Sequence, residues 1–195
     1  MSHINRQLIV ATKVGDIDCV RKLLNMGADV DAKTETTKKS LLILSTQSRQ
    51  KEMTEFLLDT GCANLEYADM SGSTPLIWAS WLGCTEIVEL LLDRGADIYT
   101  KDNFDRTSLA CASFNGFVRI TEMLLIRGSD INGRDLGDVP YTHHSKQVWR
   151  TKYIQELIIN KQPWNIKLLD DNVGILPELK EKYKEIIELS LMGLL

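Results

Sequence analysis

The sequence predicts an all-α fold in which short helix–turn–helix units repeat along the chain and stack into a solenoid. Glycines recur at positions 27, 61, 95 and 128, so their spacings are 34, 34 and 33 residues. A pair of leucines stands just before each of these glycines. Internal periods of about 20 to 50 residues are typical of repeat proteins. Such even spacing does not easily arise by chance, and it therefore predicts a repeat fold.

The first helix of each unit is predicted from its capping residues. In the third unit, Thr74 can accept a hydrogen bond from the free amides, and Pro75 suits the first helical position. Ser40 and Thr107 are the counterparts of Thr74 in the second and fourth units. The breaks between first and second helices are predicted at three further glycines, Gly15, Gly83 and Gly116.

The second helix of each unit is predicted from apolar residues at helical spacing, as in residues 87–92. The glycine that follows ends the helix, because it takes up the left-handed backbone conformation without a side-chain penalty. Small residues at 79–80 and 112–113 lie in the first helices. They should let neighbouring helices approach closely.

Residues 69–97, DMSGSTPLIWASWLGCTEIVELLLDRGAD, resemble the repeat of the ankyrin family almost throughout. Ile77 and Cys84 stand where that family usually has histidine. The resemblance implies an ankyrin-repeat solenoid with short β-turn or hairpin tips. It predicts one domain over residues 1–162, with repeats at about 4–33, 34–67, 68–100 and 101–133 and a degenerate unit at 134–162.

The last segment, residues 163–195, does not resemble the repeats. Pro163 and Trp164 punctuate the chain, and Pro177 is placed to open a helix with apolar residues along one face. An open end of a repeat stack needs a cap. We therefore expect a helical C-terminal cap packed on the stack.

Charge and terminal sequence restrict the function class. The net charge of -4 argues mildly against nonspecific nucleic-acid binding, which draws on clustered lysine and arginine. The chain lacks a run of about 18 apolar residues and an evident secretory signal, so we expect no membrane span. The expected location is the cytoplasm, or the nucleus. The divergent second unit and the tail would fit a viral or bacterial protein acting in a host cytoplasm.

No residue pattern predicts catalysis or a cofactor. The cysteines, Cys19, Cys62, Cys84 and Cys111, are far apart and are expected to be reduced thiols rather than zinc ligands. Adjacent side chains such as His143 and His144 point about 100 degrees apart on a helix, so they rarely share one ion. We therefore predict no enzyme activity, no metal and no cofactor.

The resemblance implies that the turn tips and the first helices line a concave, partner-binding face. At the tips of the third and fourth units this face would hold Met70, Ser71, Ser73, Asn103, Phe104 and Arg106. Before the inter-helix glycines it would hold Trp81, Leu82, Phe114 and Asn115, with Trp78 one turn earlier. The same helical positions in the first two units are Lys13, Val14, Gln47 and Ser48, and the second tip holds Thr36, Thr37 and Lys39.

Large aromatics beside an arginine are typical of interface hot spots. The sequence therefore predicts an interaction module or adaptor for another protein, as a monomer or weak homodimer. Trp81 and Phe114 could instead be tucked against neighbouring repeats. Two further alternatives stay open. Residues 176–180 loosely resemble the start of an F-box helix of a ubiquitin-ligase adaptor, and an imperfectly capped stack could assemble with itself.

Overall fold

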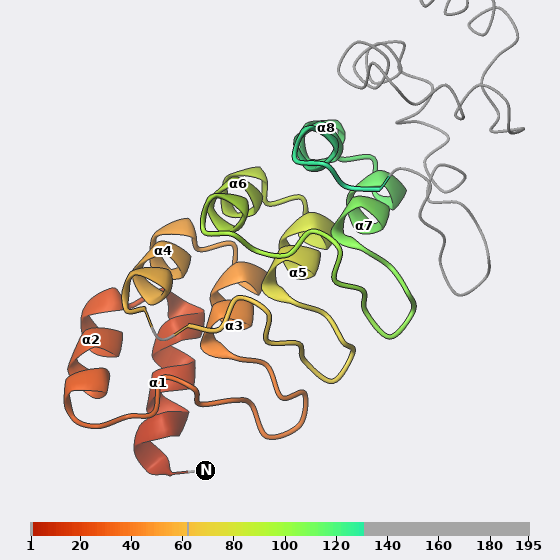
Figure 1. The fold of residues 1–195 in the computed structure, drawn as a ribbon. Helices are drawn as coiled ribbons and strands as arrows, with labels where there is room; N and C mark the ends of the chain where they lie inside the picture. Colours follow the sequence, from red (N-terminus) through yellow and green to blue (C-terminus); the bar gives the residue numbers. More distant parts are fainter. Residues whose placement is uncertain (1, 62, 131–195) are drawn as a thin grey trace, which may run out of the picture. The chain divides into compact units, whose positions relative to one another are not determined.

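The computed structural model describes residues 2–61 and 63–130, which form four consecutive helix pairs (Figure 1). The pairs are α1 (His3–Val14) with α2 (Ile17–Asn25), α3 (Leu41–Gln47) with α4 (Lys51–Asp59), α5 (Pro75–Leu82) with α6 (Thr85–Asp93), and α7 (Ser108–Phe114) with α8 (Val118–Ile126). The predicted all-α repeat fold is confirmed. The predicted fifth unit and the predicted cap, residues 134–162 and 163–195, lie outside the described residues.

The starts of the first helices follow the predicted capping. The side chains of Ser40, Thr74 and Thr107 each accept a hydrogen bond from the backbone N–H three residues later, at 3.3, 3.4 and 3.3 Å. Pro75 occupies the first turn of α5. A side-chain cap of this kind contributes about 1 kcal/mol to helix stability.

The turn between the two helices of a unit needs a left-handed residue. Gly15, Gly83 and Gly116 supply it with φ angles of 86°, 74° and 75°. In the second unit this place is taken by Arg49, which adopts φ 57°. Its Nη2 donates to the carbonyl oxygen of Leu82 at 2.8 Å, so the strained turn is accompanied by a bond to the next unit.

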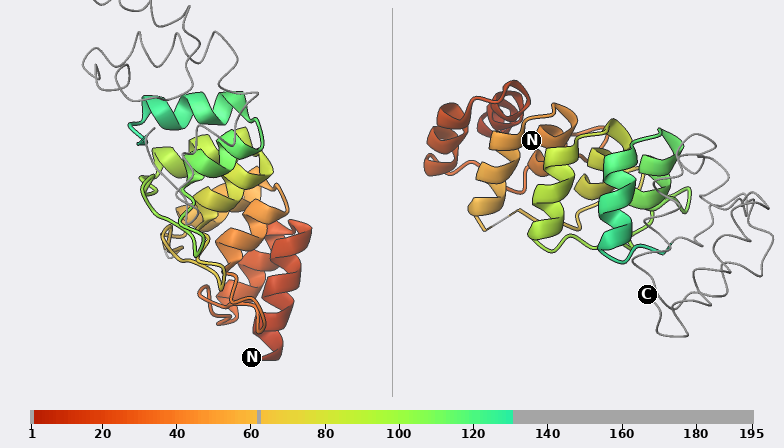
Figure 2. Two further views of the ribbon diagram at one scale, coloured as in Figure 1. Left: turned by 90° about the vertical axis from the view of Figure 1, so that its right-hand side faces the viewer. Right: turned by 90° about the horizontal axis from the view of Figure 1, so that it is seen from above.

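The helices form two rows, with the odd-numbered helices in one and α4, α6 and α8 side by side in the other (Figure 2). The first leucine of each predicted pair is buried in the core, and these residues are Leu23, Leu57, Leu91 and Leu124. Burying one such side chain contributes about 2 kcal/mol. Ala79 and Ala112 are also fully buried, on the adjacent helices α5 and α7. None of the described helices is long and apolar enough to cross a membrane.

The loops that precede α3, α5 and α7 lie next to one another as tips. The backbone N–H of Met70 donates to Thr37 O at 3.2 Å, and that of Asn103 donates to Ser71 O at 3.0 Å. Figure 1 shows these loops extending beside the row of odd-numbered helices. Tip residues and first-helix residues therefore share one side of the stack.

Candidate partner-binding site

Two aromatic rings at the ends of neighbouring first helices stack across the boundary between the third and fourth units. Trp81, near the end of α5, and Phe114, at the end of α7, have ring centroids 5.8 Å apart and planes inclined by 11°. This is the offset-stacked range that aromatic pairs favour. The sequence left open whether these rings are tucked in or exposed. Trp81 is half-buried, whereas Phe114 is exposed.

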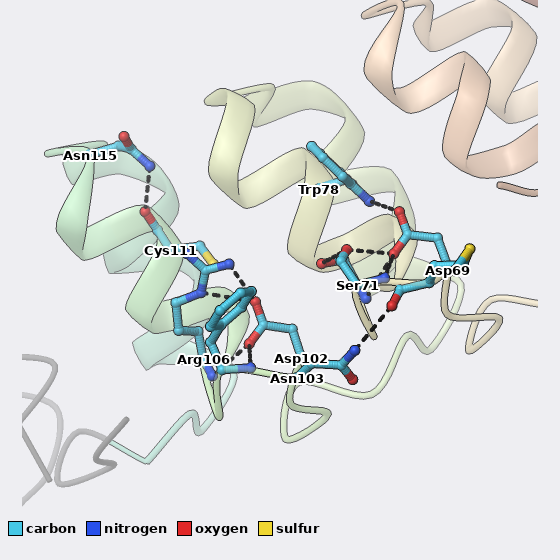
Figure 3. Close-up of polar contacts among 11 residues, drawn as sticks. Asp69, Ser71, Trp78, Asp102, Asn103, Arg106, Cys111 and Asn115 are labelled. Carbon is cyan, nitrogen blue, oxygen red and sulfur yellow. Dashed lines mark hydrogen bonds and ion pairs between the residues drawn. The ribbon is translucent and has the colours of Figure 1, made fainter. Parts of the chain in front are cut away.

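Arg106 covers this stack from the fourth tip. Its guanidinium carbon lies 5.0 Å from the centroid of Trp81 and 4.8 Å from that of Phe104. The carboxylate of Asp102 orients it, because Nε and Nη2 of Arg106 both donate to Oδ2 at 2.9 and 2.7 Å (Figure 3). The side chain of Asp102 is fully buried. The cation is therefore held in one place between two rings.

Large apolar side chains are also exposed at the two tips, Met70 at the third and Phe104 at the fourth. The exposed fractions are 64% for Met70, 54% for Phe104 and 55% for Phe114. We call Met70, Trp81, Phe104, Arg106 and Phe114 the aromatic patch. All five residues were predicted from the sequence as contact residues.

The two predicted asparagines bond to the backbone of the preceding unit. Asn103 Nδ2 donates to Met70 O at 3.0 Å, and Asn115 Nδ2 donates to Trp81 O at 3.3 Å. Both residues are exposed, so they border the aromatic patch while holding its backbone in place. Leu82, which follows Trp81, is half-buried, and its carbonyl oxygen accepts the bond from Arg49 described above.

Three predicted contact residues, Ser71, Ser73 and Trp78, form hydrogen bonds within the third unit. Ser73 is buried, and its hydroxyl accepts a hydrogen bond from the hydroxyl of Ser71 at 3.0 Å. Ser73 is therefore a correction to the predicted contact set, because its side chain does not reach the surface. Trp78 is half-buried, and its Nε1 donates to Asp69 Oδ2 at 3.0 Å. Ser71, also half-buried, donates its backbone N–H to Asp69 Oδ1.

The sequence reasoning missed two aspartates that shape the tips. Asp69 Oδ1 accepts from the backbone N–H of Ser71 and Ser73, at 2.9 and 3.2 Å. Asp102 Oδ1 accepts from the backbone N–H of Phe104 and Arg106, both at 2.9 Å. The available signal was an aspartate at the same repeat position in both units. Its side chain can bond to the backbone two residues on.

The buried thiol of Cys111 is not activated as a nucleophile. Cys111 lies on α7 at the repeat position that Trp78 occupies on α5. Burial raises the pKa of its thiol to about 12, against a smaller lowering by Arg106. The thiol therefore stays protonated at neutral pH, whereas a cysteine nucleophile needs the thiolate. Within the described residues, no group of three His, Cys, Asp or Glu side chains is placed to hold a metal ion.

Known proteins share the repeats of this chain. A family model for ankyrin repeats, in three copies, matches residues 8–102. An ankyrin repeat protein of Rickettsia bellii is 31% identical over 100 residues, which are 51% of this chain and 55% of that protein. The ankyrin repeat and KH domain-containing protein mask of Drosophila melanogaster is 36% identical over 50% of this chain and 2% of that protein.

A viral protein is also similar. The ankyrin repeat protein OPG189 of variola virus is 31% identical over 91 residues, 46% of this chain and 16% of that protein. The chain thus matches little more than half the length of the Rickettsia relative and much smaller parts of the other two. Four stacked helix pairs with capped first helices and left-handed closing glycines agree with these matches. The repeats within residues 8–102 are thus similar to those of the ankyrin-repeat family.

Proposed function

We propose that this chain binds another protein through the aromatic patch. Ankyrin repeats are generally protein–protein interaction modules, and this proposal assigns that role to one surface. The observation that carries it is the stacked pair of Trp81 and Phe114, with Arg106 held over Trp81 by the buried Asp102. A contiguous exposed apolar surface on a soluble protein marks an interaction site.

The patch has the composition and the rigidity of a binding hot spot. Tryptophan and arginine are over-represented among residues that dominate binding energy. Arg106 is already fixed by Asp102, and the Trp81 ring is already stacked on Phe114. Side chains that are ordered before binding lose less conformational entropy in the complex. The patch is therefore preorganised for a partner.

Replacing both stacked rings is the direct test. The variant Trp81→Ala with Phe114→Ala should weaken partner binding at least 30-fold, since hot-spot truncation costs about 2 kcal/mol or more. Partners captured by the wild-type chain would be identified by mass spectrometry, and their affinities measured for both proteins. Recovery of the same partners at the same strength would falsify the proposal.

A matched control separates this surface from a general loss of apolar area. Met26 and Ile126 are exposed apolar residues outside the patch, at the end of α2 and on α8. The variant Met26→Ala with Ile126→Ala should keep the wild-type affinity. Circular dichroism and urea denaturation of both double variants would show that each is folded.

The place of action is part of the same proposal. The relatives from Rickettsia bellii and variola virus fit a protein that acts on a host, so we propose a host cytoplasm as the location. The alternative of a ubiquitin-ligase adaptor depends on residues 176–180, which lie outside the described residues, and it stays a prediction.

A further inference from the structure

The two tryptophans of α5 are each covered by a cation from a flanking tip. Trp78 and Trp81 lie one helical turn apart on α5. Lys39 Nζ, from the second tip, lies 4.7 Å from the centroid of Trp78. Arg106, from the fourth tip, covers Trp81 in the same way. A partner seated on the aromatic patch therefore lies near two positive charges.

The two cations differ in how their charge is balanced. Arg106 forms an ion pair with the buried carboxylate of Asp102 at 2.7 Å. Lys39 Nζ donates instead to the neutral amide oxygen of Gln47 at 3.0 Å. Over residues 2–61 and 63–130, no carboxylate lies within ion-pair distance of Lys39. Lys39 is therefore a half-buried cation without an ion pair in this part of the chain, which favours an anion brought by a partner.

Other lysines stand at first-helix and tip positions of the first two units. The repeat position held by Trp81 and Phe114 is held by Lys13 in α1 and by Gln47 in α3. Lys13 is exposed, as is Lys38 beside Lys39. Glu35, on the same loop, forms an ion pair with Arg6 at 3.3 Å. The face thus changes from basic in the first two units to aromatic in the next two.

We propose that the aromatic patch and Lys39 together bind an acidic linear segment of the partner protein. This inference rests on the proposed function. An aromatic or large aliphatic side chain of the segment packs on the stack of Trp81 and Phe114, and an Asp or Glu carboxylate pairs with Lys39. Arg106 contributes ring contacts rather than a second carboxylate site, because Asp102 already pairs with it.

The spacing within the segment follows from α5. One helical turn advances about 5 Å along α5, neighbouring helix axes lie about 8 to 10 Å apart, and an extended peptide advances about 3.3 Å per residue. Allowing for the reach of both side chains, the acidic residue should stand about two to four residues from the anchor. The sequences of the selected peptides would show whether the acidic residue precedes or follows the anchor.

A phage-displayed library of random linear peptides, selected on the purified full chain, tests this pairing. The wild-type chain should enrich peptides with an aromatic or aliphatic anchor and an Asp or Glu two to four residues away. Lys39→Met keeps an unbranched apolar stem next to Trp78 and removes the charge. A synthetic peptide from the wild-type selection should bind Lys39→Met about tenfold more weakly, measured by fluorescence anisotropy.

Lys22→Met is the matched control, because Lys22 is an exposed lysine of α2, in a second helix. It should keep the wild-type affinity and the wild-type selection. A wild-type selection without an excess of acidic residues overturns the inference, and so does a selection that enriches nothing. An unchanged affinity in Lys39→Met also overturns it.

The double variant Trp81→Ala with Phe114→Ala tells the two proposals apart. If it binds the selected peptides as well as the wild type does, the proposed function fails with the inference. If it loses them while Lys39→Met keeps them, only the acidic segment is wrong.

Light scattering at two protein concentrations tests whether the chain forms a dimer. A concentration-dependent dimer abolished by the double variant would place a second copy on the patch and overturn the acidic partner.

Discussion

The third and fourth tips use one aspartate each in two different ways. In both tips, Oδ1 of the aspartate accepts two backbone N–H groups and so closes the turn. Oδ2 of Asp69 then accepts from the indole of Trp78, whereas Oδ2 of Asp102 accepts from the guanidinium of Arg106 (Figure 3). In each tip, Oδ1 thus stabilises the turn, whereas Oδ2 fixes one side chain on the binding face.

The third and fourth units therefore share a backbone pattern but make different side-chain contacts on the binding face. The third tip ties a half-buried ring to its own unit. The fourth tip reaches back and holds a cation over Trp81 of the third unit. The same turn therefore carries different contacts on the binding face, because the two units differ at the positions of Ser73 and Arg106 and of Trp78 and Cys111.

Among the substitutions that test this difference between the tips, Asp102→Ala is expected to lower the free energy of unfolding most. The carboxylate is fully buried, so its removal leaves two backbone N–H groups without their acceptor and Arg106 without its charge partner. The side chain of Arg106 is 33% exposed and can turn to water, which reduces the penalty. We expect a loss of about 3 kcal/mol in the free energy of unfolding. Urea denaturation measures it, and a loss below about 1 kcal/mol would contradict this role.

A smaller effect is expected for Gly72→Ala in the third tip. Gly72 has a φ of 74°, and a Cβ placed on it would lie 2.8 Å from the backbone nitrogen of Asn103. The fourth tip accepts a side chain at the same repeat position, since Asp105 has a φ of 57°. The substitution combines a strained backbone with a clash against the next tip. We expect a loss of about 2 kcal/mol by urea denaturation.

Gly95→Ala is the control for this change. Gly95 has a similar φ of 85°, but a Cβ there would meet no atom within 4 Å. Its loss should therefore be limited to the conformational cost, about 1 kcal/mol. Equal losses in the two variants would show that contact between the tips does not restrict Gly72.

The sequence predicted the features that depend on local backbone chemistry. Ser40, Thr74 and Thr107 cap their helices as expected, because a cap involves only the next few residues. The closing glycines are left-handed for the same local reason. The repeat register also placed Trp81 and Phe114 at equivalent positions on adjacent helices.

The features that were missed depend on contacts between tips and units. The burial of Ser73 follows from how the third tip folds around Asp69, which a repeat alignment does not show. The contact of Lys39 with Trp78 joins two units, and its geometry depends on how closely they stack. Arg49 replaces a glycine that the pattern would require, with its bond to Leu82 as an added inter-unit contact.

The smallest expected effect is the coupling energy between Oδ2 of the tip aspartate and the side chain that donates to it. Asp69→Asn and Trp78→Phe, made singly and together, form a double-mutant cycle across the bond at 3.0 Å. We expect a coupling of about 1 kcal/mol in the free energy of unfolding, as for one partly buried hydrogen bond. The matching cycle of Asp102→Asn with Arg106→Met should give a larger coupling, about 2 kcal/mol, because the donor is charged and two of its N–H groups bond to the carboxylate. Equal couplings would mean that the charge of Arg106 adds nothing to the fourth tip.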